Sequence, residues 1–280
     1  MKVALCQLAI EFEKKEANTR RVISFMEQAE AAGADLVLFP EMSLTGFSMN
    51  ITLTGEKNRE SVKRLCAEAK RIGIAVGFGW TALADSGINA AVDSGRSVGN
   101  NFSGSVRGEN HYTVISAGGE VLSDYVKMHP FSYSGEDRHF AKGNETVQFA
   151  LADIPFSGFI CYDLRFPEIF QAVSGRAHVI IVAADWPGRR REHWSSLLRA
   201  RAIENQCYIL GINSVGDQDG LHYTGDSCVI LPDGTVAEQL TDEEGLIFYD
   251  LVDDVEVYRQ AFPVKQDRRP ELYAKLQYAE

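Results

Sequence analysis

The sequence predicts an α/β protein in which two β-sheets pack face to face and helices cover both outer faces, a four-layer αββα sandwich. Three observations support this prediction. Short apolar runs typical of buried strands alternate with helical patterns along the whole chain. No linker rich in Pro, Gly or Ser interrupts the alternation, so residues 1–280 are expected to form a single domain. Two facing sheets with helices outside would bury all of these strands.

The N-terminal elements are a strand, a helix and a second strand. An apolar run at 3–8 predicts the first strand. Residues 15–32 carry apolar side chains at helical spacing, and Gly33 is typical of a residue that ends a helix. The apolar positions of this helix are Val22, Phe25, Met26 and Ala29. A short apolar run at 36–39 then predicts the second strand.

A helix, a buried strand and a hairpin follow. The helical pattern lies at 60–71 and the apolar run at 74–78. Residues 81–108 are rich in Gly, Ser, Asn and Ala, which predicts irregular connections or short edge strands. The apolar runs 112–116 and 121–125 flank a Gly-Gly pair, so they are expected to form a hairpin.

The second half of the chain repeats the alternation of strand and helix. Strands are predicted at 159–161, 178–183 and 207–213, and helices at 167–173 and 191–204. The turn Pro232-Asp233-Gly234 predicts a hairpin, because Asp-Gly favours tight turns. Its strands are 228–231 and 236–239, and a further strand at 246–251 closes the body.

The composition excludes several classes of partner. The net charge of −11 argues against nucleic acid and anionic membranes, which need a basic surface. No apolar run approaches the roughly 20 residues of a membrane-spanning helix. The run 3–10 lacks the cleavage site of a signal peptide. The five irregularly spaced cysteines fit reduced thiols in the cytoplasm better than disulfides or a zinc site. His139, His178 and His222 have no metal-ligand spacing, so no metal is predicted.

Three chemically active side chains each follow a predicted strand. Glu41 follows the second strand, Lys127 follows the hairpin, and Cys161 ends the strand at 159–161 and opens a helical segment. Ligands of open α/β sheets collect at the carboxyl ends of strands, so the three side chains are expected to meet there. Taken singly, each has an ordinary alternative: a packed cysteine, or a solvated glutamate or lysine. The other cysteines lie in apolar patterns and are predicted to pack in the core: Cys6, Cys66, Cys207 and Cys228.

The segments around these residues resemble the nitrilase, or carbon–nitrogen hydrolase, superfamily, whose catalytic residues are Glu, Lys and Cys. The segments are Phe39-Pro40-Glu41-Met42, Tyr125-Val126-Lys127-Met128-His129 and Cys161-Tyr162-Asp163-Leu164-Arg165-Phe166-Pro167. Later segments match the branch that contains the ω-amidases: His193-Trp194, 201–206, 225–227 and 262–273. The resemblance implies the same αββα fold. One departure is His129-Pro130-Phe131, where many relatives carry Leu before the Phe.

The resemblance implies amide hydrolysis through a thioester, without a cofactor. Cys161 would be the nucleophile, and Lys127 and a helix N-terminus are expected to favour its thiolate. Glu41 would act as general base and acid. Lys127 and the backbone N–H of Tyr162 would stabilise the oxyanion. Glu136 resembles the second glutamate of the superfamily, which is thought to orient the lysine or the substrate.

The expected substrate is a small dicarboxylic monoamide. Nitrile-cleaving relatives usually carry Cys-Trp-Glu at the nucleophile, whereas this chain has Cys161-Tyr162-Asp163. A basic run at 189–191 follows a strand at the same sheet end, so Arg189 is a candidate for binding the free carboxylate. Phe47, Trp186 and Tyr162 are candidate substrate contacts. Arg165 is expected to pair with an internal acid, Glu168 or Glu204.

Several alternatives remain at this point. N-carbamoyl hydrolases and nitrilases belong to the same superfamily. A Cys–His hydrolase that uses His129, and a non-catalytic interaction protein with this fold, belong to other classes. The partner prediction is a homodimer or larger homo-oligomer, because the segment 258–280 alternates aromatics with charges and crosses a dimer interface in similar proteins. A frayed tail is the alternative for that segment.

Overall fold

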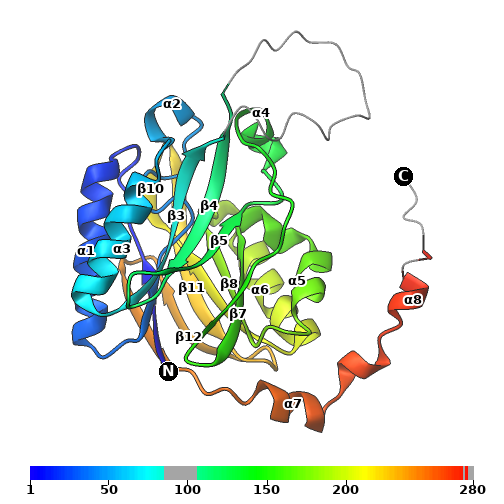
Figure 1. Ribbon diagram of the computed structural model, residues 1–280. Coiled ribbons are helices and arrows are strands. Elements are labelled where there is room, and N and C mark those ends of the chain that lie inside the picture. Colours follow the sequence, from blue (N-terminus) through cyan, green and yellow to red (C-terminus); the bar gives the residue numbers. More distant parts are fainter. Residues whose placement is uncertain (85–105, 274, 277–280) are drawn as a thin grey trace, which may run out of the picture.

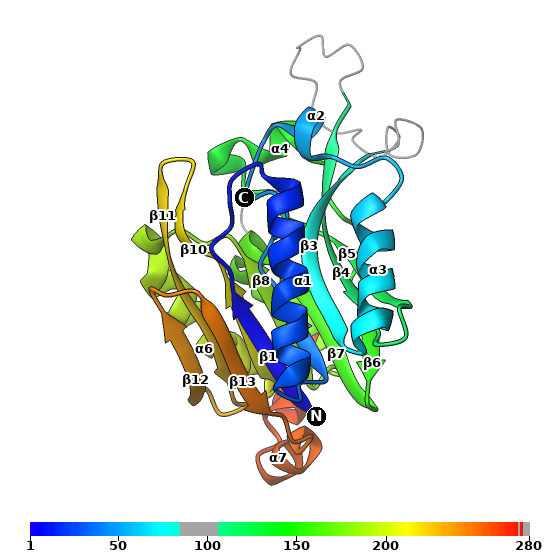
Figure 2. The same cartoon turned by 90° about the vertical axis from the view of Figure 1, so that its left-hand side faces the viewer.

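The computed structural model describes residues 1–84, 106–273 and 275–276. Within them, two mixed sheets pack face to face and helices lie on the outside (Figures 1 and 2). The predicted αββα sandwich is confirmed. Among the described residues, no helix combines the length and hydropathy needed to cross a membrane. The predicted segment 81–108 lies partly outside the described residues, and its two ends belong to strands.

The first sheet has the strand order β13-β1-β2-β3-β4-β5. Its strands are β13 (Gly245–Asp250), β1 (Lys2–Gln7), β2 (Leu36–Leu38), β3 (Ala75–Leu83), β4 (Gly108–Ile115) and β5 (Val121–Val126). β1, β2 and β3 run parallel, because helices α1 (Lys15–Ala31) and α3 (Glu60–Ile72) connect them. The single-turn helix α2 (Ile51–Thr54) lies between β2 and α3.

The second sheet has the order β10-β11-β9-β8-β7-β6, and β12 also pairs with β11. Its strands are β6 (Gln148–Leu151), β7 (Ile154–Ile160), β8 (Val179–Ala184), β9 (Tyr208–Asn213), β10 (Val215–Gln218), β11 (Leu221–Ile230) and β12 (Val236–Thr241). Helices α5 (Pro167–Val173) and α6 (Arg191–Asn205) provide the crossovers between the parallel strands β7, β8 and β9. The short helix α4 (Glu136–His139) follows β5.

Alternation along the strands divides the core into layers. Val3 and Leu5 of β1 join the cluster between the sheets, whereas Ala4 and Cys6 pack under α1 and α3. This is the period of two expected for strands that are buried on both faces. Cys66 is half-buried, and the other three cysteines predicted to pack are buried, as expected.

The hairpin β10–β11 was not predicted. Its turn carries Asp219 and Gly220, both with positive φ (46° and 73°), and Asp-Gly is a strong hairpin signal. The first half of β11 is polar, so it lacks the apolar alternation from which strands are predicted. Its buried polar side chains are instead hydrogen-bonded: the Ser227 hydroxyl donates to the Asn213 carbonyl, and the Asp226 carboxylate accepts from Arg191.

The C-terminal segment packs partly on its own chain. Helix α7 (Val255–Ala261) buries Val255 and Arg259, and the Arg259 guanidinium donates to the carbonyls of Ser174 and Ala177. From Phe262 onward most residues are exposed, and the segment with α8 (Pro270–Tyr273) extends away from the body (Figure 1). Phe262 and Tyr273, which follow α7, are exposed, so they do not pack in the core of their own chain.

Candidate active site

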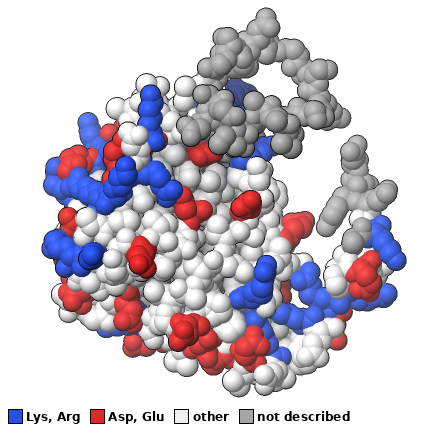
Figure 3. All heavy atoms as spheres, viewed as in Figure 1, with Lys and Arg blue, Asp and Glu red and all other residues white. Residues whose placement is uncertain are grey.

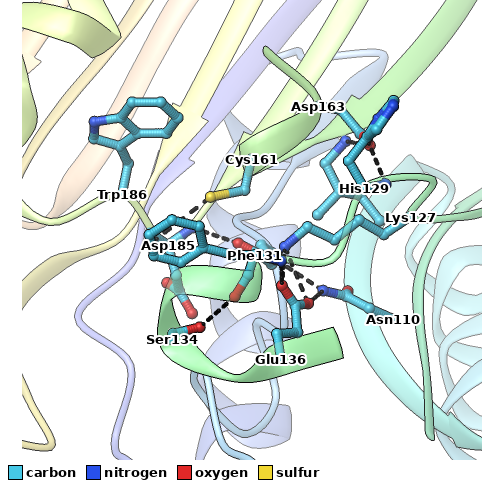
Figure 4. A network of polar contacts seen from close by, with 12 residues as sticks. Asn110, Lys127, His129, Phe131, Ser134, Glu136, Cys161, Asp163, Asp185 and Trp186 are labelled. Carbon is cyan, nitrogen blue, oxygen red and sulfur yellow. Dashed lines mark hydrogen bonds and ion pairs between the residues drawn. The ribbon is translucent and has the colours of Figure 1, made fainter. Parts of the chain in front are cut away.

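The fold brings Glu41, Lys127 and Cys161 together. Each follows the carboxyl end of a strand: β2, β5 and β7 respectively. The Lys127 ammonium lies 2.8 Å from Oε1 of Glu41, and all three residues are buried. The third sequence-predicted acid, Glu136 at the start of α4, lies 2.9 Å from the same ammonium. Figure 4 shows Lys127, Glu136 and Cys161 facing one another between the two sheets.

A network of donors fixes the two carboxylates. The Asn110 amide donates to Glu41 at 2.8 Å and to Glu136 at 3.2 Å (Figure 4). The backbone N–H of Asp185 donates to the other oxygen of Glu41 at 2.9 Å. Sequence reasoning missed Asn110 and Asp185. Asn110 lies within a strand, and no local pattern marks a buried asparagine as a contact of residues 69 and 26 positions away.

The electrostatics keep Lys127 charged. Burial by itself would lower the pKa of Lys127, but the carboxylates of Glu136 and Glu41 raise it well above its ordinary value. Burial raises the pKa of Glu136, and Lys127 acts against that shift. The site therefore presents a fixed ammonium next to the cysteine.

Cys161 lies at a strained corner of the chain. Its φ is +47°, and it opens a 3-10 turn, Cys161–Arg165, directly after β7. Burial and then the Glu41 carboxylate raise the pKa of Cys161 well above its ordinary value, and Lys127 lowers it. The influence of Lys127 has the expected sign, but burial and Glu41 act against it, so the net shift opposes ionisation of the thiol.

A pocket of about 620 Å³ opens above the thiol. The four predicted substrate contacts all line it: Phe47, Tyr162, Trp186 and Arg189. Further lining residues that the sequence did not single out for this role include Phe131, Tyr133, Arg190 and Tyr223. Aromatic side chains and a few polar groups line it, as is typical of sites for small organic ligands.

Arg165 also lines the pocket, so its predicted pairing with Glu168 or Glu204 is wrong. Its guanidinium lies 4.7 Å from the ring centroid of Trp186. Arg201 pairs with Glu204 instead, at 2.9 Å. Helix α6 turns Arg201 inward, whereas Arg165 ends the 3-10 turn at the pocket wall.

His129 belongs to a supporting network. Its Nδ1 lies 2.7 Å from Asp163, its ring stacks on Phe166, and Tyr125 donates to the second Asp163 oxygen at 2.8 Å. In the described part of the chain His129 makes no hydrogen bond to Cys161. The geometry therefore gives no support to a Cys–His pair.

We expect His129→Ala to reduce kcat far less than substitution of Lys127. The substitution removes a contact to Asp163, but it leaves every contact of Lys127, Glu41 and Cys161 in place. Steady-state rates of the variant provide the measurement. A loss as large as that of Lys127→Met would instead assign the proton transfer to His129.

The αββα fold with a buried Cys, Glu and Lys at its strand ends is that of a cysteine-dependent hydrolase. The chain belongs to the carbon–nitrogen hydrolase family, which residues 2–260 match. It is 32% identical to a 2-oxoglutaramate amidase of Bacillus subtilis (strain 168), over 97% of this chain and 98% of that protein. It is also 32% identical to the omega-amidase YafV of Escherichia coli (strain K12), over 95% of this chain and 96% of that protein.

Solved structures agree with these relatives. The chain superposes with a TM-score of 0.84 on XC1258 from Xanthomonas campestris, a CN-hydrolase superfamily protein, at 25% identity over 96% of this chain and 97% of that one. It superposes at 0.82 on an amidase from Nesterenkonia sp. AN1 with acrylamide added to the active site cysteine, at 25% identity over 98% of both chains. The protein is thus an enzyme that acts on carbon–nitrogen bonds, and its relatives support amide hydrolysis.

Proposed function

We propose that the protein is an ω-amidase, which hydrolyses the amide of a small dicarboxylic monoamide through a Cys161 thioester and releases ammonia without a cofactor. The observation that carries the proposal is the buried Glu41–Lys127–Cys161 set beneath an arginine-lined pocket. The relatives named 2-oxoglutaramate amidase and omega-amidase support the choice of substrate.

The proposed mechanism begins with proton transfer from the Cys161 thiol to Glu41. The sulfur attacks the amide carbon, and Lys127 and the backbone N–H of Tyr162 stabilise the oxyanion. Glu41 then gives its proton to the departing nitrogen, and the C–N bond breaks. In the second half Glu41 takes a proton from water, whose oxygen attacks the thioester. The C–S bond breaks and the thiol is restored.

Glu136 would hold Lys127 in position. Its carboxylate accepts from Lys127, from Asn110 and from the backbone N–H of Phe131. Glu136 is fully buried and is not among the residues that line the substrate pocket, which supports an orienting role. This agrees with the role that the resemblance implies.

The pocket arginines would bind the free carboxylate of the substrate. Arg191 is already paired with Asp226 at 2.7 Å, whereas Arg189, Arg190 and Arg165 line the pocket and, among the described residues, none has a carboxylate partner. Arg190 lies over the Phe131 ring, at 5.1 Å from its centroid. Burial, then Arg189 and Arg165, lower the pKa of Arg190, which shows how closely the cations gather.

We expect a strong preference for anionic amides. The rates on 2-oxoglutaramate and succinamate should exceed that on a neutral amide of equal length by up to about a hundredfold in kcat/KM, because charge-assisted contacts contribute roughly 1.5–3 kcal/mol. Arg189→Met should reduce this ratio, and Arg176→Met, an exposed change outside the pocket, should not. Equal rates on the neutral amide would remove the carboxylate anchor. Preferential turnover of the matching nitrile would make the enzyme a nitrilase instead.

We also propose that residues 1–280 act as one domain in a cytoplasmic homodimer, with 258–280 at the interface. The exposed apolar side chains of the tail support the interface: Phe262, Leu272, Tyr273 and Leu276. Basic side chains gather along the same tail (Figure 3). A second copy of the chain has a net charge of −11, which would attract these basic side chains. All five thiols are free, as in a reducing compartment.

Light scattering at micromolar concentration should give at least twice the chain mass of 31.0 kDa. Removal of the residues after 262 should lower that mass toward the monomer, because it deletes three of the four exposed apolar side chains of the tail, Leu272, Tyr273 and Leu276. The cut retains α7 and its Arg259 contacts, so the body should stay folded. A monomer mass for the full chain would reject the dimer.

A further inference from the structure

Asp185 is a buried acid beside the reacting groups, and its side chain has no role in the mechanism above. It is only 4% exposed, and within the described residues neither side-chain oxygen has a hydrogen-bond partner. Burial, then the Glu41 carboxylate, raise the pKa of Asp185 well above its ordinary value. Both effects disfavour the charged form of this side chain. Buried polar groups almost always have partners, so this one calls for a physical explanation.

Two more buried side chains near Asp185 have polar atoms without a hydrogen-bond partner among the described residues. Ser214, fully buried, and Gln218, 3% exposed, have side-chain atoms without a partner in the described parts of the chain. Both face Asp185 closely enough to lower its pKa, although none of the three meets the geometry of a direct hydrogen bond to another. We call Asp185, Ser214 and Gln218 the inner polar cluster. Three such groups supply the two to four polar partners that a buried water needs.

The inner polar cluster adjoins both reacting groups. The Asp185 backbone N–H donates to Glu41 at 2.9 Å, and its carbonyl lies 3.9 Å from the Cys161 sulfur (Figure 4). Asp185 also lines the substrate pocket. On the other side, Oε1 of Gln218 lies against Gly46, where an added Cβ would come within 2.5 Å of it. The cluster therefore fills the space between the pocket wall and the loop that carries Glu41.

The second half of the reaction needs a water beside Glu41. Once the acyl group is bound to Cys161, it occupies the pocket that Phe47, Tyr133 and Trp186 help to line. The attacking water must then lie within hydrogen-bond reach of Glu41 and close to the thioester carbon. Asp185 lines the same pocket and its backbone N–H donates to Glu41, so water bound by its side chain would lie near both groups.

We propose that the inner polar cluster holds the water that cleaves the Cys161 thioester, and that Asp185 orients this water toward Glu41. Glu41 accepts one proton of the water as its oxygen bonds to the thioester carbon. The C–S bond then breaks, the acid product forms, and the proton on Glu41 passes to the sulfur. Asp185 keeps its proton throughout and acts only through hydrogen bonds. The inference rests on the Cys161 thioester of the proposed function, but not on a dicarboxylic substrate.

The test separates acylation from deacylation in Asp185→Val and Gln218→Met, with Asp185→Asn as the conservative control. Rapid acid quench and intact-protein mass spectrometry measure the acyl-enzyme, and released ammonia measures acylation, on any amide that the enzyme hydrolyses. Hydroxylamine supplies a second acceptor that does not have to be bound by the inner polar cluster, so the ratio of hydroxamate to acid reports the use of water. Thermal melting checks that each variant folds.

Asp185→Val and Gln218→Met should slow deacylation about tenfold, the effect of one lost hydrogen bond. Acyl-enzyme should accumulate, the hydroxamate ratio should rise, and ammonia release in the first turnover should change by less than about twofold. Asp185→Asn should stay close to the parent enzyme, because a neutral amide also donates and accepts. Equal losses in acylation and deacylation, or an unchanged hydroxamate ratio, would overturn the proposal. Amide hydrolysis without any Cys161 adduct would refute the thioester itself, and the water site with it.

Discussion

Lys127→Met should reduce kcat by at least about 10²-fold, the effect typical of removing one oxyanion donor. The variant loses the only cation that lies within 3 Å of both Glu41 and Glu136 among the described residues. Glu41→Gln should cause a loss of the same order, because the base that receives the thiol proton is gone. Steady-state kinetics on the preferred amide measure both effects.

The double variant distinguishes a shared mechanism from two independent effects. If Glu41 and Lys127 act in one step, the combined loss should be far smaller than the product of the single losses. Removing Lys127 also leaves two buried carboxylates without a cation, which destabilises a fold by roughly 3–5 kcal/mol. Thermal melting must therefore accompany the rates. A folded Lys127→Met variant with nearly normal kcat would remove the lysine from the chemistry.

The sequence predicts the architecture well because the signal is local. The central strands β1, β2 and β3 are short, mostly apolar runs, and burial on both faces leaves little room for polar residues there. Glu41, Lys127 and Cys161 could be found because each directly follows such a run. Their convergence then follows from the rule that strand ends of the sheets meet at one edge.

The parts that escaped prediction depend on contacts distant in sequence. No pattern in the neighbouring sequence distinguishes Asn110 from other strand residues. It nevertheless donates to Glu41, which follows β2, and to Glu136 on α4, and only the folded structure brings these residues together. Asp185 could not be predicted for the same reason, because its backbone N–H donates to Glu41, which lies 144 residues away in the sequence. The strand β11 was predicted only in its apolar second half, because its buried polar first half depends on partners such as Gln7 for its stability.

The net direction of the thiol pKa shift also depends on contacts distant in sequence. The lysine and the turn after Cys161 are visible in the sequence, and both favour a thiolate. The extent of burial and the closeness of Glu41 are properties of the tertiary structure alone. They raise the pKa of Cys161 and so oppose ionisation of the sulfur.

Alkylation of Cys161 should abolish activity with a single adduct. Brief treatment with iodoacetamide near neutral pH should label Cys161 alone, because it is the only cysteine of the five that lines the substrate pocket. The remaining cysteines are shielded in the core or, for Cys66, half-buried on α3, and burial raises the pKa of each. Peptide mass mapping identifies the adduct. Full activity with Cys161 alkylated would end its assignment as the nucleophile.

The pH dependence of this labelling should move in opposite directions in two variants. The Glu41 carboxylate raises the pKa of Cys161, so Glu41→Gln should lower it and shift the labelling profile to lower pH. Lys127 lowers the same pKa, so Lys127→Met should shift the profile to higher pH. Glu41→Gln would thus be inactive in hydrolysis but more reactive toward the alkylating agent. Identical profiles in all three proteins would mean that neither charge acts on the thiol.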